Sequence, residues 1–418
     1  MKITIHRGIN QIGGCITEIA TDTTRIFIDL GQNLPDNEGV IKDELANKEA
    51  IQTLTQGIDG IFYSHYHGDH LELFHFVPDT IPQYIGKTAK LVVIEKYKHL
   101  CYIPNEKERF ESYLQKIDKM ISLTEDIPVY IKDIKVTPFF VSHSAYESFM
   151  YLIEAEGKRI LHTGDIRDHG YLGKGLRKLL NKIVRERAID VLIIEGTMLS
   201  RQGEQVKTER ELQKDAITIM KKYKNVFVLC SSTDMERLAS FHAANKKVRS
   251  RPFVCDDYQK KILDIFTRSA GEKAQLFSFD KVYDFNVNNK KLQDWMEDKG
   301  FCMSVRPTKK FSKYYDFLEK QLNNKDTVLV YSMWGEYINP KGKHAKENYL
   351  HFIKQFPNIE KLHTSGHAST ECLSDICRIV NPTQYIVPIH GEDAKNYYNL
   401  DISDSLKEKI IIKSIFSL

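Results

Sequence analysis

Short apolar runs recur along the first 200 residues and predict a series of strands. The runs are rich in β-branched and aromatic residues. They cover residues 2–6, 15–20, 25–30, 59–64, 128–131, 134–141, 148–154, 158–162 and 190–194. Helices are expected between them at 42–54, 88–100 and 174–187. Strands and helices mixed in this way predict an α/β fold built of packed layers.

From about residue 200 to 355 the pattern changes. Helical stretches are expected at 207–222, 233–245, 257–268, 311–321 and 344–354. Short apolar strands alternate with them at 226–229, 252–254 and 328–331. Such alternation predicts a mostly parallel sheet, and hence an inserted domain at 200–355 between a first part at 1–199 and a second at 356–418. The second part is expected to add a helix at 369–380, a strand at 384–390 and a final edge strand.

The loop after the strand 59–64 carries a dense polar cluster. Positions 65 to 70 follow the pattern H-x-H-x-D-H, with His65, His67, Asp69 and His70. Neutral imidazole suits Zn²⁺ and related metals, and a carboxylate adds an anionic ligand. A lone loop histidine is ordinarily a surface or capping residue, but packing gains nothing from three together. We therefore expect a metal site with an open position, as catalytic sites have.

Three further polar residues stand at the ends of predicted strands, namely His143, Asp165 and Glu195. Alone, His143 would be an ordinary polar residue and Asp165 a turn residue. Side chains at the ends of neighbouring strands gather at one sheet edge, where sites are assembled from distant segments. Beside a cluster that is short of ligands, these residues are expected to join the site.

Composition narrows the class of protein but not the reaction. The 418 residues carry a net charge of +4, with 42% hydrophobic and 28% charged residues, as in a soluble globular protein of two domains. This mild basicity permits a polyanionic partner without demanding one. Seven cysteines without a C-x-x-C pair exclude a Cys-type zinc ribbon and do not suggest a disulfide framework. With no signal peptide and no membrane-spanning run, we expect a cytoplasmic protein with no membrane partner.

The motifs resemble those of the metallo-β-lactamase superfamily, specifically its β-CASP branch of nucleases. The superfamily pattern is the run at 65–70. The assignment to the β-CASP branch depends on Glu195, Ser365-Gly366-His367 and Pro388-Ile389-His390-Gly391-Glu392. It also depends on an insert of suitable size after Glu195. Within the branch the chain is most similar to ribonuclease J-like RNA nucleases, and we expect it to lack their C-terminal domain.

The resemblance implies a fold and a metal site. The fold would be an αββα sandwich interrupted by a β-CASP cap domain. It implies seven metal ligands: His65, His67 and His143 for one ion, Asp69, His70 and His390 for the other, and Asp165 bridging both. Two divalent ions are expected, with Zn²⁺ as the first choice and Mn²⁺ as the alternative.

The implied activity is hydrolysis of RNA phosphodiester bonds by a hydroxide that two metals activate. Asp69, His367 and Glu195 would be the catalytic residues. His367 would protonate the leaving 3′-oxygen, with helix capping as the alternative reading. Glu195 would orient an imidazole of the site, and Asp69 would hold the water proton. His390 places the chain with RNA-acting members of the branch, since DNA-acting members tend to carry Val there.

Four residues are predicted to contact single-stranded RNA. Thr233, His363 and Ser365 fall near the positions that hold a 5′-terminal phosphate in the family. Trp334 is expected to stack on a base, with core packing as the alternative. Asp234 adds negative charge where a phosphate would dock. Endonucleolytic and 5′-to-3′ exonucleolytic cleavage therefore both remain open.

Three other functions compete with this interpretation. A small-molecule metallohydrolase, such as a lactonase or thioesterase, shares the run at 65–70, but the insert and His367 argue against it. A DNA nuclease is disfavoured by His390. An inactive RNA-binding subunit would ordinarily have lost ligands, and all seven are present here. A homodimer is open, whereas the tetramer of ribonuclease J is not expected.

Overall fold

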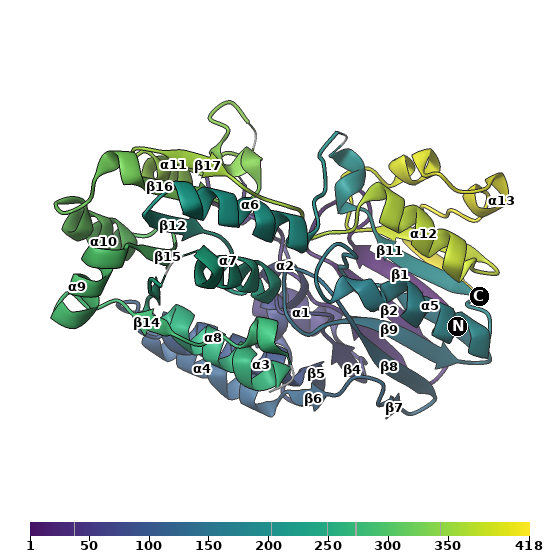
Figure 1. Ribbon diagram of the computed structural model, residues 1–418. Helices are drawn as coiled ribbons and strands as arrows, with labels where there is room; N and C mark the ends of the chain where they lie inside the picture. The colour runs from purple at the N-terminus through teal and green to yellow at the C-terminus, as the bar shows by residue number, and fades with distance from the viewer. Residues whose placement is uncertain (37, 202, 249, 272–273, 343) are drawn as a thin grey trace. The chain divides into compact units, whose positions relative to one another are not determined.

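The structure is a computed structural model that describes residues 1–418 except 37, 202, 249, 272–273 and 343. The chain forms two compact units (Figure 1). The first comprises Met1–Leu34, Ile41–Glu204 and Gly366–Leu418, and the second comprises Pro35–Val40 and Gln205–Ser365. Most of the insert expected at 200–355 lies in the second unit. The domain boundaries at 200 and 355 remain a prediction.

One sheet of the first unit has seven strands in the order β19-β1-β2-β3-β4-β5-β6. They are β1 (Lys2–Arg7), β2 (Ile16–Ala20), β3 (Arg25–Ile28), β4 (Gly60–Phe62), β5 (Gln83–Gly86), β6 (Ile121–Leu123) and β19 (Ile415–Ser417). The pairs from β3 to β6 are parallel and the others antiparallel. The predicted edge strand is confirmed, because β19 pairs with β1.

The other sheet of the first unit has six strands in the order β18-β11-β10-β9-β8-β7. They are β7 (Val129–Ile131), β8 (Ile134–Val141), β9 (Ser148–Ala155), β10 (Lys158–His162), β11 (Val191–Glu195) and β18 (Tyr385–Ile389). β9 and β10 form an antiparallel hairpin. Its turn residues Glu156 and Gly157 both have positive φ, 49° and 70°, as the tight turn of a hairpin requires.

The core of the first unit follows from the alternation of side chains along its strands. Tyr151 and Ile153 of β9 pack in the core that the two sheets share. Met150 and Leu152 point the other way and pack with residues of two helices. The helices of this unit are α1 (Lys48–Leu54), α2 (Gly68–Leu71), α3 (Lys87–Leu100), α4 (Lys107–Lys119), α5 (Leu176–Glu186), α12 (Thr370–Val380) and α13 (Asp404–Lys407). Because α5 and α12 cover the second sheet and α3 packs beside β5 and β6, the layers are helix, sheet, sheet and helix.

One expected helix is shorter than predicted. The pattern predicted a helix over 42–54, but α1 begins only at Lys48, where the Asn47 side chain accepts a hydrogen bond from Ala50 N. The preceding residues are held in a loop by Asp43, whose carboxylate accepts hydrogen bonds from Arg7 Nη1 at 2.6 Å and Asn33 N at 2.8 Å. These long-range bonds override local helix propensity.

The second unit is built on a six-stranded sheet in the order β14-β13-β15-β12-β16-β17, and every strand pair is parallel. Its strands are β12 (Asn225–Leu229), β13 (Phe253–Cys255), β14 (Val282–Asp284), β15 (Phe301–Val305), β16 (Thr327–Tyr331) and β17 (Ile359–Lys361). The expectation of a mostly parallel sheet is confirmed. The pattern did not predict β14 or β15, and it placed the strand that is β17 from Lys361 onward.

Helices cover this parallel sheet. They are α6 (Glu209–Lys222), α7 (Met235–Val248), α8 (Asp257–Ala270), α9 (Lys290–Lys299), α10 (Lys309–Glu319) and α11 (Glu347–Ile353). Residues of α9, α10 and α11 share a core with β12, β15 and β16. α6 and α7 pack against each other (Figure 1). Among the described residues, no helix is both long and apolar enough to span a bilayer.

Short 3₁₀ turns complete the chain. They are η1 (Glu72–Phe76), η2 (Gly173–Gly175), η3 (Thr197–Ser200), η4 (Gln275–Phe277), η5 (Asn324–Asp326), η6 (Gly335–Ile338) and η7 (Ala394–Asn399). In η1, the His75 ring stacks on Tyr113 of α4 with ring centroids 4.0 Å apart. Its Nδ1 lies 2.8 Å from Glu72 O. Burial lowers the pKa of His75 to about 4, so the folded protein favours the neutral ring.

Deleting side-chain atoms from the core between the sheets should destabilise the first unit. We expect Ile153→Ala to lower the free energy of unfolding by about 2–5 kcal/mol, because it removes apolar contacts and leaves a cavity. Ile127→Ala, at a residue that is 58% exposed, should change it by less than about 0.5 kcal/mol. Urea titrations of both variants followed by circular dichroism test this. Equal losses would contradict the burial of Ile153.

His75 should make stability depend on pH. Its pKa is near 6.5 in the unfolded chain and about 4 in the folded protein. The contribution of neutral His75 to the free energy of unfolding is therefore complete above pH 6.5, and it is lost as the pH falls through about 4. Between pH 7 and 4, wild type should lose about 3 kcal/mol more than His75→Phe. Unfolding titrations across this range, with exposed His351→Phe as the control, measure the difference. Parallel pH curves for wild type and His75→Phe would refute the expectation.

Candidate metal centre

The second sheet brings several predicted site residues to one edge. β10, β11 and β18 are parallel neighbours, so their carboxyl ends meet. β8 and β10 both run antiparallel to β9, and thus end at the same edge. The residues at or just past these ends are His143, Asp165, Glu195 and His390. The loop 65–70 joins them from β4 of the other sheet.

Three imidazoles form the first group of donors. His67 Nδ1 lies 3.1 Å from His65 Nε2 and 3.2 Å from His143 Nε2. All three donor atoms lie within 4.8 Å of one another. His65 and His143 are buried, and His67 is half-buried. The structure thus brings together the three residues predicted for one ion.

The second group combines imidazoles and carboxylates. His390 Nε2 lies 3.2 Å from Asp69 Oδ2, and His70 Nε2 lies 3.2 Å from Asp165 Oδ2. Asp165 Oδ2 is also 3.8 Å from His65 Nε2 and 3.6 Å from His390 Nε2. Asp165 therefore stands between the two groups, where a bridging ligand was predicted.

The donors fit a metal ion. His70 Nε2 and Asp165 Oδ1 are buried and make no well-formed hydrogen bond within the described part of the chain, although Asp165 Oδ2 lies 3.2 Å from His70 Nε2. Leaving such polar groups buried without a partner is costly, so a missing partner is expected. Imidazole nitrogen with carboxylate oxygen is a donor set that zinc accepts. The cluster can therefore bind metal.

Hydrogen bonds hold three of the rings from behind. His70 Nδ1 lies 2.7 Å from Asp29 Oδ2, and His390 Nδ1 lies 2.7 Å from Thr197 Oγ1. His143 Nδ1 lies 2.6 Å from Gly366 O. Bonds of this kind fix the ring orientation and leave Nε2 for a metal. Sequence reasoning missed Asp29 and Thr197, although Asp29 stands at the end of a predicted strand like the ligands themselves.

The two groups of donors differ in their protonation. Burial lowers the pKa of His67 to about 4 and also lowers the pKa values of His65 and His143, so these rings are neutral. Burial would also lower the pKa of His70, but the carboxylates of Asp165 and Asp29 raise it well above the usual value. Burial by itself would raise the pKa of Asp69. The hydrogen bond to His390 and the nearby imidazoles outweigh this effect and hold the pKa below its usual value. Neutral imidazoles and ionised carboxylates are the forms that bind metal, so the first group and Asp69 are ready to bind, whereas His70 would give up its proton to an ion.

Two glycines allow the backbone to close around the loop. A Cβ atom at Gly31 would lie 1.7 Å from Asp69 O, which no side chain tolerates. Gly13 has a positive φ of 78°, and its Cβ would lie 3.0 Å from Asp69 Oδ2. Close backbone approach on both sides thus fixes Asp69 in the centre.

Glu195 and His367 lie beside the cluster. His367 Nδ1 is 3.2 Å from Glu195 Oε1 and 3.7 Å from Asp165 Oδ2. Glu195 is fully buried and also accepts hydrogen bonds from Ala368 N at 3.2 Å and Thr197 N at 3.1 Å. The His367 side chain remains 18% exposed, so it can reach a substrate while its orientation is held.

The residues predicted to contact RNA all lie in the second unit. His363 Nδ1 is 3.3 Å from Arg237 Nη1, and Thr233 lies 3.3 Å from Ser231 between the two hydroxyl oxygens. Ser365 is buried. Trp334 is half-buried, and its ring lies 5.5 Å from the Tyr337 ring between centroids. Their proposed role in RNA binding stays a prediction.

Asp234 and Arg237 have structural partners. Asp234 is buried and its Oδ1 accepts a hydrogen bond from Arg237 N at 3.1 Å, in the first turn of α7. The Arg237 side chain forms a buried ion pair with Glu209, with Nη2 to Oε1 at 2.8 Å. Its remaining N–H groups donate to Ser332 Oγ at 2.8 Å and Thr364 O at 2.9 Å. The negative charge of Asp234 thus serves to cap a helix.

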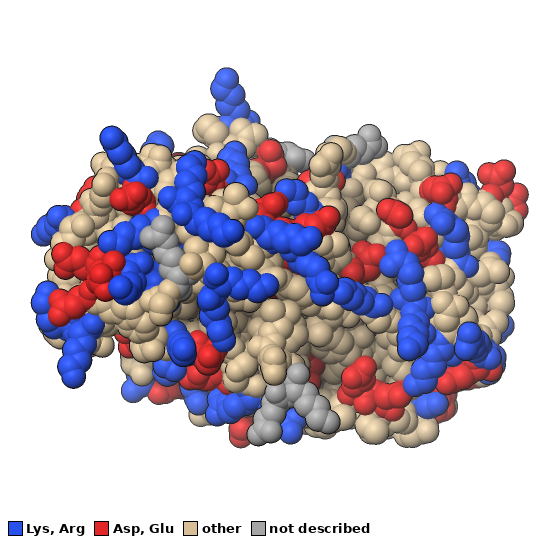
Figure 2. Space-filling view, viewed as in Figure 1, with Lys and Arg blue, Asp and Glu red and all other residues tan. Residues whose placement is uncertain are grey.

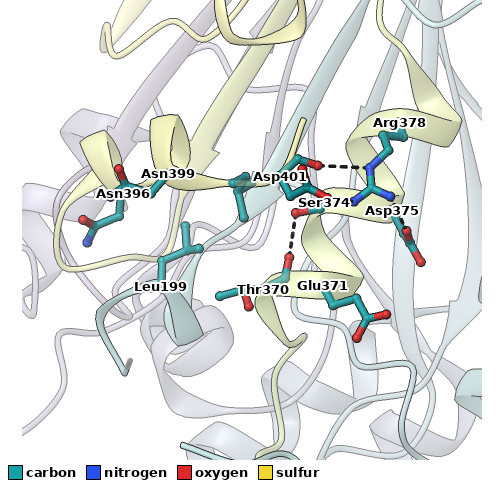
Figure 3. A pocket seen from close by; sticks show the side chains of 10 residues that line it. Leu199, Thr370, Glu371, Ser374, Asp375, Arg378, Asn396, Asn399 and Asp401 are labelled. Atoms are coloured by element: carbon teal, nitrogen blue, oxygen red, sulfur yellow. Dashed lines mark hydrogen bonds and ion pairs between the residues drawn. The ribbon is translucent and has the colours of Figure 1, made fainter. Parts of the chain in front are cut away.

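The first unit also holds a surface hollow of about 520 Å³ (Figure 3). Its walls come from α12, η3, η7 and adjoining residues. Arg378 lies between two acidic residues, with Nη1 3.2 Å from Asp375 Oδ1 and Nη2 3.2 Å from Asp401 Oδ2. The lining carries three carboxylates, those of Glu371, Asp375 and Asp401, against this one guanidinium, so the hollow is net acidic.

Two family descriptions match the chain. Residues 24–225 match the beta-lactamase superfamily domain, which includes the loop 65–70, and residues 357–412 match the Zn-dependent metallo-hydrolase RNA specificity domain. The chain therefore carries a domain of the beta-lactamase superfamily and an RNA specificity domain of Zn-dependent metallo-hydrolases. The resemblance inferred from the motifs is confirmed. The second match contains His367 and His390, so both ends of the chain contribute to the same centre.

Similar proteins include several ribonucleases J. That of Helicobacter pylori (strain B128) is 22% identical over 408 residues, covering 94% of this chain and 56% of the relative. An RNase J-like protein of Methanocaldococcus jannaschii is 28% identical over 193 residues, covering 46% of this chain and 41% of that protein. This chain therefore spans little more than half the length of the Helicobacter relative.

A solved structure shares the fold. The crystal structure of a protein of unknown function from Enterococcus faecalis V583 aligns with a TM-score of 0.70 at 20% identity, covering 94% of this chain and 95% of that one. At this identity the likeness concerns the fold alone. It confirms the predicted α/β architecture of the superfamily.

Removing the support of one ring should weaken metal binding. We expect Asp29→Asn to lower zinc affinity by about 10- to 100-fold, because the amide no longer holds the His70 Nδ1–H as a carboxylate does. Competition with a chromophoric chelator measures the affinity. Asp22→Asn, at an exposed carboxylate of the same unit, should leave it unchanged. An unaltered affinity in folded Asp29→Asn protein would contradict the role of Asp29.

Proposed function

We propose that this superfamily member is a metal-dependent ribonuclease that hydrolyses phosphodiester bonds in single-stranded RNA. The observation that carries the proposal is the Glu195–His367 pair beside the buried cluster, with the His367 and His143 rings 4.9 Å apart between centroids. A proton donor held next to a metal centre suits ester hydrolysis with a poor leaving group. The match of residues 357–412 to an RNA specificity domain supports RNA as the substrate.

Two divalent ions are proposed for the centre, with Zn²⁺ as the first choice and Mn²⁺ as the alternative. Their proposed ligands are His65, His67 and His143 for one, Asp69, His70 and His390 for the other, and Asp165 between them. Such ions lower the pKa of water toward neutrality and neutralise charge on a phosphate. Asp69 is ionised at neutral pH and can hold the proton of the attacking water.

His367 is proposed as the general acid. Glu195 Oε1 accepts a hydrogen bond from Nδ1, so the proton on Nε2 is the one available for the leaving 3′-oxygen. Glu195 itself is fully buried and acts by holding His367 and the backbone of Ala368. Proton transfer by a positioned imidazole contributes about 10²- to 10⁴-fold to such reactions.

The second unit is proposed to bind the RNA through Thr233, His363, Ser365 and Trp334. Figure 2 shows Lys and Arg side chains gathered over α6 and its surroundings. Several are paired with acidic neighbours, as Lys207 is with Asp215 at 2.7 Å and Lys222 with Glu360 at 3.3 Å. The basic surface therefore gives the proposal only modest support, and aromatic stacking by Trp334 carries more of it.

The proposal is tested with zinc-loaded protein on labelled single-stranded RNA and DNA. Each RNA carries either a 5′-monophosphate or a 5′-hydroxyl group. We expect metal-dependent cleavage of RNA, loss of cleavage in Asp69→Ala, and a fall in kcat of about 10²- to 10⁴-fold in His367→Ala. Exposed His351→Ala is the matched control and should cleave like wild type.

The pattern of products then distinguishes the alternatives. Internal cuts that ignore the 5′ group indicate an endonuclease, whereas stepwise release that requires a monophosphate indicates a 5′-to-3′ exonuclease. Hydrolysis of lactones or thioesters without RNA cleavage would overturn the proposal in favour of a small-molecule metallohydrolase. Cleavage of DNA in preference to RNA would overturn the choice of substrate.

A further inference from the structure

One thiol lies among the donors of the centre. Cys15 is 2% exposed and immediately precedes β2. Its Sγ atom and donor atoms of His70 and His390 all lie within 4.8 Å of one another. The backbone holds it there: Cys15 N donates to Asp69 O at 3.0 Å, and Cys15 O accepts from Gly31 N at 3.0 Å. The thiol is thus tied to the loop that supplies Asp69 and His70.

The surroundings of the neighbouring His70 ring are those of a residue that binds a metal ion. His70 is 1% exposed, and its Nδ1 lies 2.7 Å from Asp29 Oδ2. Its Nε2 makes no well-formed hydrogen bond within the described residues, and the nearest carboxylate is Asp165 Oδ2 at 3.2 Å, itself a proposed metal ligand. An imidazole held at Nδ1 by a carboxylate, with a buried thiol, a second imidazole and another carboxylate close by, is the donor arrangement of a metal site.

We propose that Cys15 Sγ is a ligand of the ion held by Asp69, His70 and His390. The inference rests on the proposed metal-dependent function and refines it. As the sulfur–metal bond forms, the thiol proton leaves to solvent, and Cys15 binds as a thiolate. No redox change is involved.

A sulfur ligand would set which metal this position prefers. Thiolates favour thiophilic ions such as Zn²⁺, whereas carboxylate and water ligands suit Mn²⁺. With Cys15 the position offers sulfur, nitrogen and oxygen donors. Without it only nitrogen and oxygen remain. The centre should therefore select Zn²⁺ over Mn²⁺ at this position, and the selection should depend on Cys15.

Cobalt provides a direct readout. Protein freed of metal is loaded with Co²⁺, and two absorption features are recorded. The visible d–d bands report that cobalt is bound. The ultraviolet sulfur-to-cobalt charge-transfer band reports a thiolate ligand. We expect the charge-transfer band in wild type and its loss in Cys15→Ser and Cys15→Ala. Cys101→Ser, which removes a half-buried thiol after α3, should keep it.

Metal competition gives a second readout. Apoprotein is equilibrated with Zn²⁺ and Mn²⁺ together, and the bound metals are quantified by elemental analysis. The preference for Zn²⁺ over Mn²⁺ should fall by about 10- to 100-fold in Cys15→Ser and stay unchanged in Cys101→Ser.

The wild-type spectrum alone can overturn the inference, whether or not the variants fold. Bound cobalt with d–d bands and no charge-transfer band would do so, as would a band that persists in Cys15→Ser. RNA cleavage by the same samples is scored separately. A thiolate band in a protein that does not cleave RNA supports the ligand and counts only against the ribonuclease proposal.

Discussion

Hydrogen bonds at Nδ1 of three imidazoles are the constraint on which the candidate metal centre of the first unit depends. Each of His70, His143 and His390 is bound at Nδ1, by Asp29, Gly366 O and Thr197 respectively. These partners come from separate parts of the chain, so the rings can be oriented only when both sheets and α12 are in place. Their orientation is therefore set by the fold, before an ion contributes any binding energy.

Much of this arrangement could be predicted from the sequence, because strands and metal ligands leave local signals. Short apolar runs rich in β-branched and aromatic residues marked the strands, and the ends of those strands pointed to His143 and Asp165. Asp29 also stands at the end of a predicted strand, but nothing set it apart from an ordinary turn residue, and Cys15 left no signal at all. A single polar residue at a strand end or a lone thiol is ordinary until its neighbours are known. The expected helix start at 42 was wrong because Asp43 is held by Arg7 from a distant strand.

The second unit shows the same limit. Its βα alternation predicted the parallel sheet, but β14 and β17 are only three residues long and carry too few apolar residues for a clear signal. Glu209 opens a charged helix and would be expected at the surface. It is instead fully buried against Arg237. Burying such a pair costs desolvation energy, which the five N–H bonds of the guanidinium offset.

The pairing of β18 with β11 has a consequence for how the protein folds. These parallel strands are separated in the sequence by residues 205–365 of the second unit, and His390 follows β18 directly. During synthesis, one edge of β11 stays unpaired until Tyr385–Ile389 has left the ribosome. Residues 205–365 of the second unit leave the ribosome earlier and can form their parallel sheet meanwhile. The candidate metal centre is then completed last, only after the first unit has closed.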